Sequence, residues 1–156
     1  MKKAICSLVF FFLYRGLRVL QRRDSRVRAD LAAIPEGFSL RLEASPEQGA
    51  PSVVMVLTPQ GLRRGKKGDG AKIVVTFKSL DTAFRVVTGR MGIWECYARR
   101  AFYLKGNINE AMGFIRGMEY VEAYLFPRFM TRRILKRVPR KQLPTLAVYA
   151  MVLAGK

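Results

Sequence analysis

The chain has 156 residues, enough for one domain with a sizeable core, and half of them are hydrophobic, so disorder is not expected. Lysine and arginine number 29 against 11 acidic residues, and the net charge of +18 favours an anionic partner, either a membrane surface or nucleic acid. The sequence contains no histidine, which removes the most common general base and metal ligand near neutral pH.

The positive charge is concentrated at the two ends of the chain. Residues 1–30 carry eight basic and two acidic groups, and residues 125–156 carry eight basic groups and no acidic one. This distribution fits a folded module with basic ends. Cys6 and Cys96 lie in unrelated contexts and are too few for a metal site, so we expect reduced cysteines and no cofactor.

The first apolar run is AICSLVFFFLY, residues 4–14, preceded by Lys2 and Lys3. It is too short to span a bilayer, which takes about 20 apolar residues, and no good signal-peptide cleavage site follows it. We therefore favour a helix that lies in the membrane interface with its arginines near the headgroups. A helix packed on the protein's own core and a spanning signal-anchor remain alternatives. The predicted membrane contacts in this segment are Val9, Phe10, Phe11, Phe12, Leu13, Arg15, Arg18 and Arg22.

Three strands are predicted next. Apolar residues alternate with polar ones over residues 40–44, which is typical of a half-buried strand. The continuous apolar run VVMVL at residues 53–57 predicts a more deeply buried strand. A turn at residues 59–61 then leads to a basic edge strand over residues 62–67.

A glycine-rich loop follows these strands. Gly65-Lys66-Lys67-Gly68 matches the GXXG loop of KH domains, which clamps a nucleic-acid backbone. That loop joins two helices, whereas here it joins two strand-like segments. We therefore favour a solvated connection and keep a nucleic-acid-binding module as the alternative function.

Residues 73–105 read as strand, helix, short turn and strand. Ile73, Val75 and Phe77 point to one face of a strand. Ser79 is placed to cap a helix with an apolar face from Leu80 to Met91, and Gly89 is its expected C-terminal stop. A short apolar turn begins at residues 93–94, and the aromatic-rich segment 101–105 predicts another strand.

The next helix begins with a capping-box-like pair, Asn107 and Glu110. Its apolar face is formed by Ile108, Ala111, Met112, Ile115 and Met118.

The C-terminal region carries two further apolar segments. Pro127 is placed to start a basic amphipathic helix that runs to Val138, and this helix contacts either a membrane surface or the core. Its predicted membrane contacts are Arg132, Arg133, Lys136 and Arg137. Residues 146–153 are too short to span a bilayer, so they dock over the domain or touch lipid.

Three segments of the sequence together resemble the sterol carrier protein 2 (SCP2) sterol-binding domain. They are VVTFKSLDTAF at 74–84, VVTGRMGIWECYARRAFYLKGNINEAM at 86–112 and VEAYLFPRF at 121–129, and the resemblance extends over about residues 31–130. It implies an α+β fold in which helices cover a mainly antiparallel sheet and enclose an apolar cavity, with an added N-terminal helix and C-terminal helices. We expect three parts: a membrane-contacting helix at 1–30, the SCP2-like domain at 31–138 and an apolar tail at 139–156.

The resemblance also implies a function. We expect a non-catalytic carrier or accessory protein that holds a sterol, a fatty acyl chain or an isoprenoid quinone, because some bacterial relatives assist quinone biosynthesis. It would be cytoplasmic and peripheral or monotopic on the inner face of a membrane, with an anionic membrane surface and a lipid- or quinone-metabolising complex as partners. The predicted lipid-lining residues are Phe77, Phe84, Val87, Trp94, Phe102, Leu104, Met112, Ile115 and Met118.

The acidic residues support the non-catalytic reading. Asp81, Glu95, Glu110, Glu119 and Glu122 are spaced as helix caps and solvent faces, and none is paired in sequence with a base or nucleophile.

Overall fold

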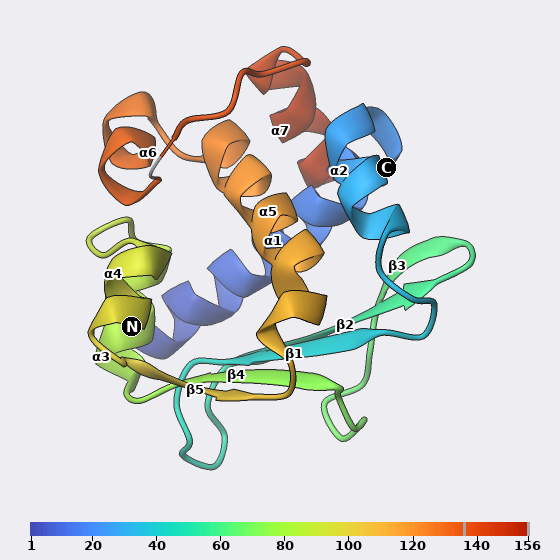
Figure 1. The fold of residues 1–156 in the computed structure, drawn as a ribbon. Coiled ribbons are helices and arrows are strands. Elements are labelled where there is room, and N and C mark those ends of the chain that lie inside the picture. The colour runs from blue at the N-terminus through green and yellow to red at the C-terminus, as the bar shows by residue number, and fades with distance from the viewer. Residues whose placement is uncertain (136, 156) are drawn as a thin grey trace.

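The structure is a computed structural model that describes residues 1–135 and 137–155. Within these residues the chain forms seven helices and one five-stranded sheet with the strand order β3-β2-β1-β4-β5. The helices gather on one face of the sheet (Figure 1). The predicted α+β fold is therefore confirmed.

The sheet is mainly antiparallel, as predicted. Its antiparallel pairs are β1–β2, β2–β3 and β4–β5, and the central pair β1–β4 is parallel, with Leu42 beside Val75. Alternation turns Leu40 and Leu42 of β1 toward the helices, where both are buried. The strands are β1 (Ser39–Glu43), β2 (Ser52–Thr58), β3 (Gly61–Arg64), β4 (Ile73–Phe77) and β5 (Phe102–Lys105).

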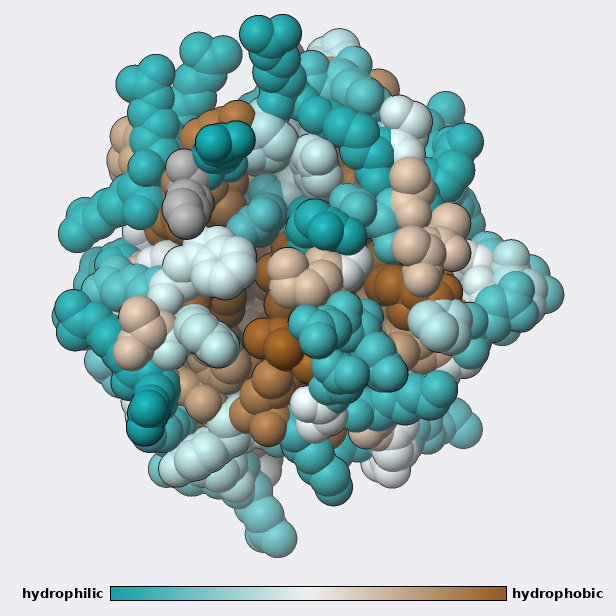
Figure 2. Space-filling model, viewed as in Figure 1, coloured by the Kyte–Doolittle hydropathy of each residue, from teal (hydrophilic) through white to brown (hydrophobic). Residues whose placement is uncertain are grey.

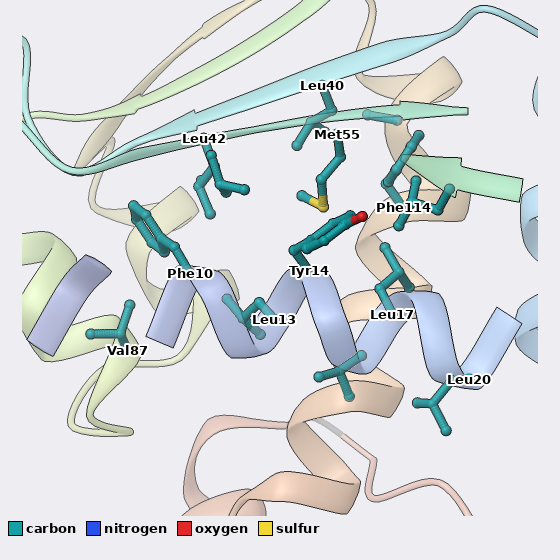
Figure 3. Packing of buried hydrophobic residues seen from close by; sticks show 14 of the residues in the cluster. Phe10, Leu13, Tyr14, Leu17, Leu20, Leu40, Leu42, Met55, Val87 and Phe114 are labelled. Carbon is teal, nitrogen blue, oxygen red and sulfur yellow. The ribbon is translucent and has the colours of Figure 1, made fainter. Parts of the chain in front are cut away.

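The N-terminal helix α1 (Lys2–Arg23) is a core element. It packs against β2, β3 and the helices α2, α3, α5 and α7, and Figure 3 shows Phe10 and Tyr14 pointing from α1 toward Leu42 and Met55 of the sheet. By length and composition α1 could cross a membrane, and 44% of that apolar window is buried inside the protein. The expectation that Phe10 and Leu13 contact lipid is wrong for this structure: their exposed fractions are 1% and 8%, because the sheet needs an apolar cover.

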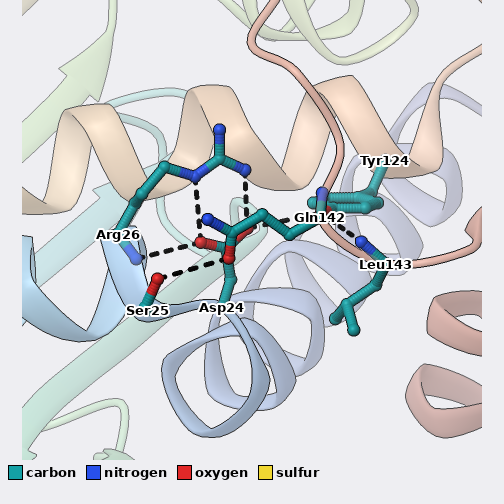
Figure 4. A network of polar contacts seen from close by, with 6 residues as sticks. All are labelled: Asp24, Ser25, Arg26, Tyr124, Gln142 and Leu143. Carbon is teal, nitrogen blue, oxygen red and sulfur yellow. Dashed lines mark hydrogen bonds and ion pairs between the residues drawn. The ribbon is translucent and has the colours of Figure 1, made fainter.

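A buried carboxylate joins α1 to α2 (Ser25–Ala32). Asp24 caps α2 by accepting a hydrogen bond from the Arg26 backbone N–H, and its carboxylate also forms an ion pair with the Arg26 guanidinium at 2.8 Å. The Tyr124 hydroxyl also donates a hydrogen bond to the Asp24 carboxylate, at 3.3 Å (Figure 4). This polar cluster ends α1 and fixes the direction of α2.

The short helices α3 (Leu80–Val87) and α4 (Ile93–Ala98) follow β4. The predicted cap is confirmed, since the Ser79 side chain accepts a hydrogen bond from the Thr82 N–H. The predicted stop at Gly89 also holds, with φ at +67°. Met91 therefore lies beyond α3, although its side chain is buried.

Asn107 caps helix α5 (Ile108–Leu125), as predicted, and the helix runs two turns past Met118. It has two apolar sides, because Phe114, Gly117 and Val121 are buried in addition to the predicted face. Contacts with α1 and α2 account for this second buried side.

Two short helices complete the chain. Pro127 precedes α6 (Arg128–Ile134), as predicted, but the helix ends before Leu135 and does not reach Val138. Lys136 lies outside the described residues. In α7 (Thr145–Ala154), Val148 and Val152 are buried in the same apolar cluster as α1 and the sheet. The predicted N-terminal, central and C-terminal parts thus share one core.

Candidate functional site

An apolar cavity of about 90 Å³ lies between the sheet and the helices α1, α3 and α5. Strands β1, β4 and β5 form its floor, and residues of α4 and of the end of α5 also line it. Its described lining residues are Val9, Phe10, Leu13, Leu40, Leu42, Val75, Phe77, Val86, Val87, Ile93, Phe102, Leu104, Ile108, Ala111, Ile115, Met118, Glu119, Glu122 and Phe126.

Most of the predicted lipid-lining residues meet at this cavity. The structure brings together six of them, from β4, α3, β5 and α5: Phe77, Val87, Phe102, Leu104, Ile115 and Met118. Strand β4 pairs directly with β5, which places Phe77 opposite Phe102 and Leu104 opposite Val75. Their contact with a lipid remains a prediction.

Three predicted residues lie elsewhere. Phe84 on α3 is half-buried against the core but does not line the cavity, and the Lys2 ammonium and the Arg90 guanidinium each lie 5.8 Å from its ring. Trp94 is 45% exposed, and Met112 is half-buried outside the cavity wall. A one-residue shift around a helix is enough to move such side chains off the cavity.

The sequence-based reading missed the contribution of α1 and β1. Val9, Phe10 and Leu13 were assigned to a membrane, but all three line the cavity. The alternation of Leu40 and Leu42 was the available signal for β1, since it turns both side chains to the covered face of the sheet.

A second apolar cavity, of about 310 Å³, lies between α1, α5 and α7. Four residues line both cavities and form the wall between them: Val9, Leu13, Glu122 and Phe126. On the face shown in Figure 2, hydrophobic residues are visible in a hollow where Figure 1 has α4 and α5, framed by hydrophilic side chains. The apolar interior therefore comes close to the surface here.

Two carboxyl groups interrupt the apolar lining. Burial, together with the nearby charge of Glu119, raises the pKa of Glu122 to about 8. Glu119 accepts a hydrogen bond from the Trp94 indole Nε1 at 3.1 Å. Trp94 thus does not line the cavity, but its indole is hydrogen-bonded to Glu119, which does.

The other chemical groups are few. Among the described residues, no three metal-ligating side chains cluster together. Cys6 and Cys96 are buried free thiols, and burial raises the pKa of both, that of Cys96 to about 11. Both thiols are therefore protonated at neutral pH and poorly nucleophilic.

The predicted membrane contacts are distributed unevenly over the surface. Phe11, Phe12, Arg15 and Arg18 are half-buried. The other described arginines that are predicted to contact a membrane are exposed. They lie on α1 and around α6: Arg22, Arg132, Arg133 and Arg137. Three of these arginines lie in the C-terminal region. Large apolar side chains are exposed in the same region: Phe129 at 75%, Leu146 at 83% and Leu153 at 65%.

The glycine-rich loop does not have the surroundings of a KH loop. Residues 65–68 connect β3 to β4, and the Lys66 N–H donates a hydrogen bond to the Asp69 carboxylate at 2.8 Å. Because no helix flanks the loop on either side, the structure does not reproduce the backbone clamp of that domain.

Solved structures of known proteins resemble this chain in fold. No protein-family model matches the chain, and no curated protein is significantly similar in sequence. The apo structure of sterol carrier protein 2 from Yarrowia lipolytica is similar with a TM-score of 0.52 and 17% identity, over 76% of this chain and 93% of that chain.

Two further solved structures are similar. One is a UbiJ-SCP2 ubiquinone synthesis protein, with a TM-score of 0.45 and 21% identity over 76% of this chain and 88% of that chain. The other is a conserved hypothetical protein of Thermus thermophilus, with a TM-score of 0.49 and 20% identity over 79% of this chain and 86% of that chain. On the architecture and the first of these similarities, the chain has the fold of the sterol carrier protein 2 domain.

Proposed function

We propose that the protein is a non-catalytic lipid carrier that holds one long apolar chain between its sheet and its helices. The observation that carries this proposal is the apolar cavity enclosed by β1, β4, β5, α1 and α5, with a second apolar cavity beside it. Apolar cavities in proteins stay dry and accept apolar guests. The SCP2 fold supports the proposal at the level of architecture.

The two cavities differ in what they can accept. Pockets that bind small molecules commonly measure about 300–1,000 Å³. The second cavity reaches that range at about 310 Å³, whereas the first, at about 90 Å³, is smaller. A chain-like ligand would occupy both once the side chains of Val9, Leu13 and Phe126 moved apart.

The binding energy would come from burial of apolar surface. Each methylene moved from water into the cavity contributes about 0.8 kcal/mol, so about a dozen contribute on the order of 10 kcal/mol before ordering costs. Met118 suits such a wall, because its flexible side chain conforms to an irregular chain.

We also propose that the carrier works at an anionic membrane surface. The exposed apolar side chains of Phe129, Leu146 and Leu153 lie on α6 and α7, the two helices within the strongly basic C-terminal region. Basic residues near an anionic surface contribute about 1 kcal/mol each. The apolar side chains would insert among the headgroups, and a ligand would pass between bilayer and cavity.

A cavity-filling substitution tests the carrier function. Ala111 lines the first cavity and is 1% exposed, so Ala111→Phe places a ring in the space assigned to the ligand. Ala32→Phe, at an exposed position of α2, is the matched control. The measurements are mass spectrometry of lipid extracted from gently purified protein and the change in Trp94 emission on titration with a long-chain lipid.

We expect lipid in the wild-type protein and in Ala32→Phe, and little or none in folded Ala111→Phe. Absence of lipid from the wild-type protein, together with no saturable change in emission, contradicts the proposal.

A further inference from the structure

Glu122 is the polar residue among the four that line both apolar cavities. Its side chain, on α5, lines both the first cavity, between the sheet and α1, and the second cavity, between α1, α5 and α7. The other residues shared by the two cavities, Val9, Leu13 and Phe126, are all hydrophobic. A chain that occupied both cavities would therefore pass directly beside the Glu122 carboxyl.

Nothing in the described part of the chain satisfies this carboxyl. The side-chain hydrogen bonds and ion pairs of residues 1–135 and 137–155 include none to the Glu122 carboxyl, whereas Glu119 one turn earlier is bound to Trp94. The Glu122 side chain is half-buried and lines both cavities, so its carboxyl oxygens are accessible to a molecule that occupies them. A ligand oxygen in the cavity would supply the missing partner.

The surroundings determine the charge of this group. Two other titratable groups are found among the described lining residues: Glu119 on α5 and Tyr149 on α7, whose hydroxyl donates to the Leu125 carbonyl. The α1, α3, α4 and strand residues of the two walls are all uncharged. Burial, assisted by the Glu119 charge, raises the pKa of Glu122 to about 8, so at neutral pH the group is a carboxylic acid that can both donate and accept a hydrogen bond.

We propose that the Glu122 carboxyl is the recognition group of the cavity and binds a neutral carbonyl or hydroxyl oxygen on the lipid chain. This inference rests on the proposed carrier function and narrows its ligand class. It favours long-chain ketones, quinones and alcohols over fatty acids. A carboxylate ligand would bring a negative charge beside Glu119 into a wall whose described residues include no lysine or arginine.

The ligand preference can be measured directly. The full chain is incubated with phosphatidylcholine vesicles that contain equal amounts of palmitic acid and of the methyl ketone, primary alcohol and alkane of the same chain length. The protein is then re-isolated, and its bound molecules are quantified by mass spectrometry. We expect the ketone and the alcohol to exceed both the acid and the alkane, the acid by about tenfold at neutral pH.

Three variants assign the preference to Glu122. Glu122→Leu keeps an apolar wall, and we expect it to bind the ketone and the alkane equally. Glu122→Gln keeps a neutral donor and should retain the ketone. The control Glu119→Gln alters the neighbouring carboxyl that Trp94 already binds, and the ketone should still exceed the alkane.

The pH dependence gives a second readout. From about pH 7 to about pH 9 the wild-type protein loses its acidic proton, so ketone binding should fall by up to about tenfold. Glu122→Gln should show no such fall.

The outcomes separate the two proposals. Uptake of all chains with the same distribution in the wild-type protein and in Glu122→Leu overturns the role of Glu122 and leaves the carrier function standing. Uptake of no chain by any variant overturns the carrier function, and the role of Glu122 with it.

Discussion

Gly113 shows how closely α5 approaches α2. A Cβ atom at this position would lie 2.6 Å from the Asp30 carbonyl oxygen and 2.7 Å from the Ile34 Cδ1. The first of these atoms belongs to the backbone, so it cannot rotate away. Glycine is therefore required by packing here, in the middle of a helix where it is otherwise unfavourable.

Substitution of this glycine should destabilise the fold. We expect Gly113→Val to lower the free energy of unfolding by about 2–3 kcal/mol, because the overpacked side chain forces α5 away from α2. Gly70→Val is the control, since no atom lies within 4 Å of the Cβ position there, and its effect should stay within about 0.5 kcal/mol. Urea denaturation measures both, and equal stability of the two variants would contradict the close packing.

Glu122 should also make stability depend on pH. Its pKa is raised to about 8 in the folded protein and returns to the ordinary carboxyl range on unfolding, so the folded state holds the proton more tightly. The resulting penalty is absent in acid and grows as pH rises toward about 8. We expect the stability of Glu122→Gln relative to wild type to increase by up to about 1.4 kcal/mol per pH unit between about pH 5 and pH 8. A difference that does not change with pH would show that Glu122 ionises freely in the fold.

The sequence could not have located Glu122. Its spacing on α5 is that of a solvent-facing residue, and the prediction that it lies on such a face is wrong. A helix covered on one side leaves a polar face for water, but α5 contacts α1, α2, α6 and α7. Only the three-dimensional arrangement turns this acidic residue toward apolar surroundings.

At the scale of elements, the Asp24 cluster connects three segments that are distant in sequence. The Tyr124 hydroxyl donates to Asp24 and accepts hydrogen bonds from the backbone N–H groups of Gln142 and Leu143, at 2.7 and 3.2 Å. Burial alone would raise the pKa of Asp24, but the hydrogen bonds from Arg26 and Tyr124 outweigh it and lower the pKa. The end of α1 and the segment before α7 are thus both attached to α5.

Removal of this hydroxyl should loosen the C-terminal segment. We expect Tyr124→Phe to lower the free energy of unfolding by about 2–3 kcal/mol, since it removes a hydrogen bond to a charged group and leaves two N–H groups without their acceptor. Hydrogen exchange should accelerate at Gln142 and Leu143 in particular. Tyr103→Phe, at an exposed position of β5, is the control. Unchanged exchange at both amides would show that the contact with Tyr124 does not hold this segment.

The starts of the helices that follow a capping residue or a proline were predicted correctly. Ser79, Asn107 and Pro127 each precede a helix in the structure, because caps and N-terminal prolines act through the adjacent backbone alone. The place of α1 could not be predicted in the same way. An apolar helix face is equally suited to a lipid tail and to a sheet, and only the pairing of distant strands decides which one it meets.

At the scale of the whole molecule, the positive charge of the C-terminal region has no counter-charge within that region. Described ion pairs engage Lys2, Arg26, Arg41, Arg99 and Arg116, all outside it. Residues 125–156 contain no acidic residue, so their cations are suited to an external anion.

Vesicle binding should therefore depend on α6. We expect the double substitution Arg132→Ala and Arg133→Ala to weaken binding to phosphatidylserine-containing vesicles by about 2 kcal/mol, roughly 30-fold. The matched control is Arg63→Ala with Arg64→Ala, two adjacent exposed arginines on the edge strand β3. Co-sedimentation at low salt measures both, and binding of the wild type should decrease as salt is added. If the two double variants bound equally, the charge would act without a preferred face.

The place of α1 in the core has a consequence for synthesis. Helix α1 leaves the ribosome well before α5, which packs against it and is completed about a hundred residues later. At translation rates of about 5–20 residues per second, the nascent helix waits on the order of 5–20 s with its apolar side uncovered. Phe10 and Leu17 are buried in the folded protein, so a chaperone or a bilayer surface that shields them during this interval would protect the chain from aggregation.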